Sequence, residues 1–183
     1  MKIKFFLIDV SYEVKRKEPT VLLWGVSEAS EPILVMDRGF RPYFYVLPEE
    51  SVRPEDLLVR LRALSRPASP IIEAEVLEMK YYGRPVKVVK VSTLIPEYVR
   101  TYRDEARKLP GVADVLEADI RYYMRYLIDK DISPSSWVEA EVEEVENTGR
   151  YRVKKVFEVT GEIRNAPLEP PPDLRILAFD IEV

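Results

Sequence analysis

The order of apolar patterns between residues 40 and 120 limits the fold more than any other feature of the sequence. Two segments, 54–64 and 96–109, repeat apolar residues at helical spacing and open on a proline, which suits the first turn of a helix. Short apolar runs that are typical of strands stand before, between and after them, at 42–47, 71–82, 85–92 and 112–120. The order β-α-β-β-α-β predicts a ferredoxin-like core at about residues 40–120.

The flanking segments predict an α+β chain of mainly antiparallel strands. An opening meander is predicted at 3–10, 20–26 and 33–36, a helix at 121–130, a charged hairpin at 137–146 and 150–162, and an apolar strand at 174–183. Four prolines between 167 and 172 predict a stiff linker before that last strand. We therefore expect an N-terminal domain at 1–134, a hairpin and linker at 135–173, and a terminal strand at 174–183 that belongs to a further domain.

The composition narrows the chemistry that the chain can carry. The 183 residues include neither cysteine nor histidine, which excludes disulfides, zinc fingers, cysteine nucleophiles and Ser-His-Asp triads. The net charge of −4 is unlike that of a DNA-coating protein, so a nucleic-acid contact needs a local basic patch or a larger protein around it. No apolar run approaches the ~20 residues of a membrane helix and no signal peptide is evident, so we expect a cytoplasmic protein.

The balance of residue types also favours a thermophilic source. Charged residues make up 33% of the chain, and 15 prolines stand against 6 glycines. Abundant charge and stiff loops are typical of proteins that work at high temperature.

Two acids near the end of the sequence are candidate metal ligands. Asp180 and Glu182 are predicted to project from one face of the last strand, because strand residues alternate between faces. A hard cation such as Mg²⁺ neutralises such a pair well, and a two-metal nuclease site begins in this way. Two solvated acids on an edge strand give the same pattern. Two carboxylates cannot hold two metal ions, so we expect no complete catalytic site and no bound Mg²⁺ in this chain by itself.

The helix predicted at 121–130 interleaves aromatic and cationic residues. Such interleaving suits base stacking and phosphate contact, and an amphipathic helix that packs its tyrosines inward gives the same pattern. The residues concerned are Arg121, Tyr122, Tyr123, Arg125, Tyr126 and Lys130. A ferredoxin-like RNA-binding module also needs aromatics on both central strands, and the strand at 85–92 has none.

Five segments resemble the N-terminal region of archaeal family B DNA polymerases, in that family's order. They are LIDVSY, FRPYFYVL, YYGRPVKVVKV, ADVLEADIRYYMRYLIDKDISP and LRILAFDIEV. The stretch LAFDIE is similar to the first exonuclease motif of the family. Residues 135–173 form a longer stretch than in the euryarchaeal members of the family, and the resemblance implies nothing about them. The resemblance implies that the chain is the N-terminal part of a longer polymerase, up to the start of its 3′–5′ exonuclease domain.

The resemblance further implies a pocket that captures uracil in the template strand and stalls copying. By position, its lining residues are Tyr12, Pro42, Tyr43, Pro96, Val99, Ile120 and Tyr122. The residues implied to lie near DNA phosphates are Arg100, Arg103 and Arg125. Arg100 stands where euryarchaeal members often have a proline.

For the longer protein, the resemblance implies DNA synthesis, proofreading with Mg²⁺, and a sliding-clamp contact outside this sequence. Three alternatives remain: a nuclease in its own right, an RNA- or single-strand-binding module without uracil selectivity, and part of a polymerase relative that has lost catalysis.

Overall fold

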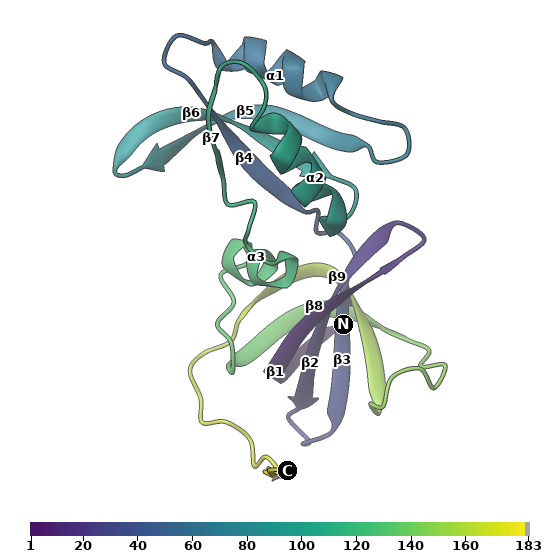
Figure 1. Ribbon diagram of the computed structural model, residues 1–183. Helices are drawn as coiled ribbons and strands as arrows, with labels where there is room; N and C mark the ends of the chain where they lie inside the picture. The colour runs from purple at the N-terminus through teal and green to yellow at the C-terminus, as the bar shows by residue number, and fades with distance from the viewer. Residues whose placement is uncertain (182–183) are drawn as a thin grey trace. The chain divides into compact units, whose positions relative to one another are not determined.

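The structure, a computed structural model, describes residues 1–181, which divide into two compact units (Figure 1). The first unit comprises residues Met1–Tyr12, Val21–Arg38 and the chain from Tyr126 onward, and the second comprises Glu13–Thr20 and Gly39–Arg125. The bounds of these units differ from the predicted ranges 1–134 and 135–173. Those ranges remain a prediction about the functional parts of the chain. None of the helices among the described residues is long and apolar enough to cross a membrane.

A closed five-stranded barrel forms most of the first unit. Its strands are β1 (Lys2–Lys15), β2 (Glu18–Ser27), β3 (Pro32–Asp37), β9 (Lys155–Asn165) and β8 (Trp137–Val145), in that order around the barrel. The predicted hairpin is observed as the antiparallel pair β8–β9. It closes the barrel because β8 pairs antiparallel with β1 and β9 pairs parallel with β3.

Apolar residues of these strands are buried in continuous runs, such as Phe5–Leu7 and Ile33–Met36, and not in alternation. Phe5, Leu23 and Val138 are fully buried, and the Phe6 and Trp137 rings meet edge to face at 5.6 Å. One charged group is buried with them, since Asp37 is 6% exposed and accepts a hydrogen bond of 2.9 Å from the Tyr126 hydroxyl.

The second unit contains the predicted β-α-β-β-α-β order. Its elements are β4 (Tyr43–Pro48), α1 (Pro54–Ala63), β5 (Ile71–Tyr81), β6 (Arg84–Thr93), α2 (Pro96–Ala106) and β7 (Val112–Leu116). The strands form one antiparallel sheet in the order β5-β6-β4-β7, and Figure 1 shows α1 and α2 beside it. The α+β class predicted from the sequence is confirmed.

The two helices bury the predicted apolar stripes. Leu57 and Leu61 of α1, and Tyr102 and Ala106 of α2, are at most 1% exposed and form one core cluster with the inner residues of the sheet. The buried Tyr102 ring keeps its hydroxyl satisfied, because that hydroxyl donates a 2.5 Å hydrogen bond to the carbonyl of Ser69. This core holds α2, and with it several of the predicted site residues, against the sheet.

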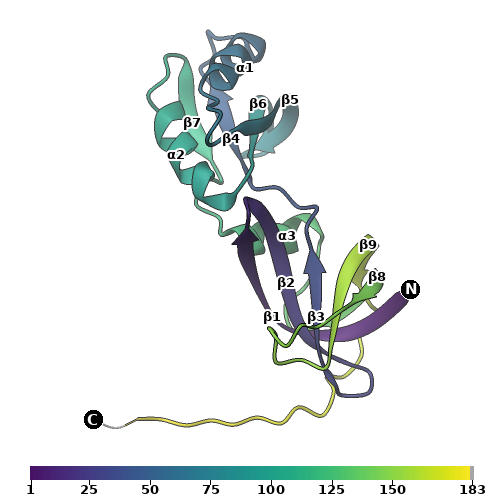
Figure 2. The same ribbon diagram turned by 90° about the vertical axis from the view of Figure 1, so that its right-hand side faces the viewer.

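A short helix and an extended segment complete the chain. Helix α3 (Tyr122–Asp129) replaces the slightly longer helix predicted at 121–130. Residues 166–181 contain neither helix nor strand, and Figure 2 draws this part as an extended trace. Ile176, Leu177, Phe179 and Ile181 are 74–87% exposed. The segment 174–183, which we expect to pair as a strand within a further domain, is unpaired and extended over its described part.

Candidate nucleic-acid interface

The first residue of β4, Tyr43, is the centre of an aromatic and cationic cluster in the second unit. Its ring lies edge to face with that of Tyr45 at 5.3 Å. The Lys90 ammonium lies 4.4 Å from the Tyr43 ring centroid, and the Arg125 guanidinium carbon lies 5.0 Å from it. Two cations against one ring hold this tyrosine in place, because the face of an aromatic ring attracts positive charge.

Arg125 is buried in this cluster. It is 6% exposed and forms an ion pair with Glu117, whose backbone adopts a positive φ of 59°. The Glu117 side chain is 37% exposed, so the ion pair matters mainly for Arg125, which would otherwise be a buried charge without compensation. The phosphate contact implied for Arg125 remains a prediction, and it requires the guanidinium to exchange Glu117 for a phosphate.

The main chain just before β4 is braced from two sides. The Tyr122 hydroxyl donates a 2.7 Å hydrogen bond to the carbonyl of Phe40, and the two rings lie 5.4 Å apart. The amide of Thr93 donates a 2.9 Å hydrogen bond to the carbonyl of Pro42. Contacts from β6 and α3 thus fix residues 40–43. Their backbone N–H and C=O groups therefore hold set positions at which a ligand could bind.

Helix α2 carries four of the predicted residues. Pro96 occupies its first turn, and Val99 is partly buried against the core of the sheet. Arg100 is exposed, whereas the Arg103 guanidinium forms an ion pair with Asp104 at 2.8 Å. The hydrogen bond from Arg103 lowers the pKa of Asp104, and the charges of Arg103, Arg100 and Arg107 lower it further. The pKa of Arg103 is raised by the same hydrogen bond.

Two further predicted residues, Ile120 and Tyr12, lie outside β4, α2 and α3. Ile120 is partly buried in the segment before α3. Tyr12 lies on β1 in the first unit and is 37% exposed. The structure therefore brings Arg125 against Tyr43 and Tyr122 against Phe40, two residues before Pro42. Its contacts do not test the implied position of Tyr12.

Several contact residues of this cluster were absent from the predicted site residues: Phe40, Tyr45, Lys90, Thr93 and Glu117. Lys90 could have been found from strand register, because it stands opposite Tyr45 in the β4–β6 pair. Phe40 precedes the predicted Pro42 by two residues. Nothing in the local sequence around Glu117 indicates that it pairs with Arg125.

The tyrosines of α3 point mainly into the protein. Tyr122 and Tyr126 are 6% and 0% exposed, whereas Arg121 and Lys130 are exposed. Arg121 donates a 3.0 Å hydrogen bond to the hydroxyl of Tyr123. Of the two interpretations of this helix, inward packing describes Tyr122 and Tyr126, and only Tyr123 is left partly accessible between cations.

Of the two candidate metal ligands, Asp180 alone lies among the residues that the structure describes. Asp180 lies in the extended segment, where its carboxylate accepts a hydrogen bond of 2.8 Å from the amide of Ile181. Glu182 lies outside the described residues. Among residues 1–181, no group of three or more acidic, histidine or cysteine side chains is arranged to hold a metal ion. The donors seen around Asp180 therefore do not by themselves fit Mg²⁺.

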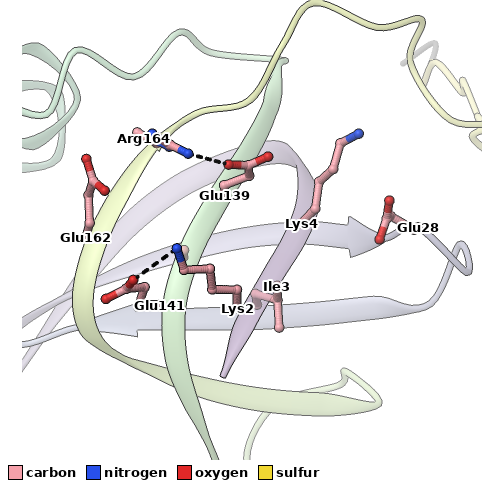
Figure 3. A pocket seen from close by; sticks show the side chains of 9 residues that line it. Lys2, Ile3, Lys4, Glu28, Glu139, Glu141, Glu162 and Arg164 are labelled. Atoms are coloured by element: carbon pink, nitrogen blue, oxygen red, sulfur yellow. Dashed lines mark hydrogen bonds and ion pairs between the residues drawn. The ribbon is translucent and has the colours of Figure 1, made fainter.

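A second charged region lies on the barrel, in a cavity of about 330 Å³ (Figure 3). Its lining carries four carboxylates, those of Glu28, Glu139, Glu141 and Glu162, and three cations, those of Lys2, Lys4 and Arg164. Lys2 pairs with Glu141 at 3.3 Å and Arg164 pairs with Glu139 at 3.1 Å. Two of the four carboxylates are thus paired with cations of the same cavity, and the described residues there form no group that could hold a metal ion.

Comparisons with known proteins agree on one family. Residues 113–183 match the family model described as DNA polymerase family B, exonuclease domain. DNA polymerase 2 of Aeropyrum pernix is 43% identical over 99% of this chain, and DNA polymerase 3 of Saccharolobus solfataricus is 32% identical over 98% of it. The solved family B DNA polymerase of Pyrobaculum calidifontis superposes with a TM-score of 0.78 at 36% identity over 94% of this chain.

These relatives are much longer than this chain. It spans 23% and 22% of the two curated polymerases and 21% of the chain in the solved structure. Over nearly its whole length, the chain matches the N-terminal region of archaeal family B DNA polymerases.

Proposed function

We propose that this chain binds the single-stranded template of a family B DNA polymerase and captures uracil from it, so that copying stalls before a deaminated cytosine is fixed as a mutation. The observation that carries the proposal is the braced cluster around Tyr43. Tyr43 begins the central strand β4, and hydrogen bonds from Tyr122 to Phe40 and from Thr93 to Pro42 hold the main chain just before it.

The rigidity of this cluster matters because uracil and thymine differ by one methyl group. A close-fitting wall excludes a methyl by sterics, which is typically worth about 1–3 kcal/mol and more where the wall cannot move. Val99 is the proposed wall, and it is packed against the core by α2. Cytosine would be rejected for another reason. Its hydrogen-bond donors and acceptors differ from those of uracil, so the fixed backbone groups at Tyr43 and Ile120 would not find matching partners on it.

The charged residues nearby suit the flanking phosphates. Arg100 is exposed on α2, and Arg103 is partly exposed beside Asp104. A single-stranded template offers its bases without unpairing, so little energy opposes their extrusion into a pocket. Arginine is the side chain that holds phosphate oxygens most specifically.

The test is a fluorescence titration of the chain with single-stranded DNA that carries one uracil or one thymine, at fixed salt because phosphate contacts depend on salt. We expect tighter binding to uracil, and we expect Val99→Gln to abolish the difference. Val59→Gln is the matched control, since Val59 is a valine of α1 that is 67% exposed. Equal binding of both oligonucleotides by the parent chain would refute uracil capture and would favour a single-strand-binding module without base selectivity.

For the longer protein, we propose DNA synthesis and 3′–5′ proofreading with Mg²⁺, together with a sliding-clamp contact, in the cytoplasm of a thermophile. The match of residues 113–183 to the exonuclease-domain model supports the proofreading part. Asp180 and Glu182 would be the residues of this chain that hold Mg²⁺, which would polarise a phosphoryl oxygen and activate water. Primer extension and exonuclease assays on the full-length protein test this; absence of both activities would indicate a relative that has lost catalysis.

A further inference from the structure

A cavity of about 380 Å³ on the barrel has a composition unlike that of the charged cavity in Figure 3. Its lining is mainly apolar, with Ile8 and Val26 from β1 and β2, and it includes two aromatic rings, Trp24 and Tyr151. Its charged lining residues are both cations, Arg150 and Arg152. A cavity of this size suits a small planar group, since binding sites for small molecules start at about 300 Å³.

The loop that forms one side of this cavity is well anchored. It connects β8 to β9, and the Asn147 side-chain amide donates hydrogen bonds of 3.1 and 3.0 Å to the carbonyls of Tyr151 and Val153. The amide of Lys154 donates a 2.8 Å hydrogen bond to the carbonyl of Pro32. The loop thus holds Tyr151 over the barrel strands in a defined position.

The two rings form a partly exposed aromatic wall. Trp24 and Tyr151 meet edge to face at 5.8 Å with an interplanar angle of 72°, and both are only partly buried. The indole nitrogen of Trp24 donates a 2.8 Å hydrogen bond to the Ser11 hydroxyl, which fixes the plane of that ring. Ile8, which is 50% exposed, adds apolar surface beside them.

The positive charge of the loop is concentrated at this cavity. In the run 150–155, RYRVKK, the two lysines are engaged elsewhere, since Lys154 pairs with Glu31 and Lys155 pairs with Glu144. The two arginines line the cavity, and the Arg150 guanidinium lies 5.4 Å from the Tyr151 ring centroid.

We propose that this cavity binds one base of single-stranded DNA, stacked on Trp24 or Tyr151, with Arg150 and Arg152 on the adjacent phosphates. Aromatic rings beside cations are the general means of holding single strands without reading their sequence. An acidic peptide would satisfy the arginines and leave the aromatic wall without a planar partner. This cavity would be a second contact for the single-stranded DNA template. The choice of DNA as the ligand rests on the proposed function.

The test uses the tryptophan fluorescence of the chain, which contains two tryptophans. In a Trp137→Phe background, Trp24 is the remaining reporter, and Trp137 is not among the residues lining the cavity. We expect an oligothymidylate to quench Trp24, and an abasic oligonucleotide of equal length and charge to leave it unquenched. Tyr151→Ala should weaken oligothymidylate binding by about 5- to 150-fold, the range that corresponds to one lost stacking contact.

Arg152→Ala keeps the proposal testable if Tyr151→Ala disturbs the loop, because Arg152 is an exposed side chain. It should reduce the salt dependence of binding by about one phosphate contact, whereas Arg175→Ala, which also removes an exposed cation, should not. Equal quenching by the abasic strand, equal quenching by an acidic peptide, or an unchanged salt dependence in Arg152→Ala would overturn the proposal. Val99→Gln separates the two sites, since it should remove uracil preference and leave Trp24 quenching intact.

Discussion

Removal of the Tyr126 hydroxyl should destabilise the barrel unit by a predictable amount. Tyr126 is 0% exposed and its hydroxyl donates a 2.9 Å hydrogen bond to the carboxylate of Asp37, which is 6% exposed. Hydrogen bonds to charged groups contribute about 1.5–3 kcal/mol, and water cannot easily replace a donor at this depth. We therefore expect Tyr126→Phe to lower the free energy of unfolding by about 1.5–3 kcal/mol.

A matched substitution supplies the reference. Tyr98→Phe also removes one hydroxyl, which donates a 3.0 Å hydrogen bond to the carbonyl of Ala68 at an exposed position. Water can take over that acceptor, so the expected loss is about 0.5 kcal/mol or less. Urea unfolding followed by far-UV circular dichroism gives both values, provided that the slope of each transition matches that of the parent chain. A loss in Tyr126→Phe no larger than that in Tyr98→Phe would refute the assignment of a strong buried hydrogen bond.

Two further substitutions test packing and electrostatics. Gly25→Ala should lower the free energy of unfolding by about 3 kcal/mol, the upper part of the range for overpacking, because the new Cβ would clash with the backbone carbonyl oxygen of Phe6. A urea midpoint equal to that of the parent chain would contradict this. Arg103→Ala should raise the pKa of Asp104 measured by carboxyl NMR titration, because its hydrogen bond is the main cause of the lowered value. Since the folded pKa of Asp104 lies below its unfolded value of about 3.9, the stabilisation by Arg103 is present above that pH and is lost as the pH falls through the folded pKa. An unchanged pKa in Arg103→Ala would rule out this cause.

The helices and strands of the second unit could be predicted well from the sequence. Pro54 and Pro96 mark the first turns of α1 and α2, and the apolar stripes through Leu61 and Tyr102 are buried as their spacing requires. Such signals are local, because each depends on residues within one or two turns of one another.

The barrel could not be predicted in the same way. Its closure depends on the parallel pairing of β3 with β9, in which Val35 stands opposite Phe157 across more than a hundred residues of chain. Neither strand contains a local signal that names the other as its partner. A hairpin was therefore predicted where the structure has two of five barrel strands.

The candidate site was predicted only in part for a similar reason. Tyr43 and Tyr122 could be placed through the family resemblance, but Glu117 is identified only by its ion pair with Arg125. In the sequence, Arg125 looks like a solvated cation, and its 6% exposure follows from tertiary packing.

The closed barrel has a consequence for the apolar residues that follow it. Every strand of the closed barrel has a neighbouring strand on each side, so the barrel has no edge strand to which a sixth strand could add along its whole length. Ile176, Leu177 and Phe179, which are 80–87% exposed, cannot be sheltered by adding to that sheet. A run of this composition is prone to self-association unless another sheet takes it up. The barrel therefore ensures that this segment stays available for pairing outside it.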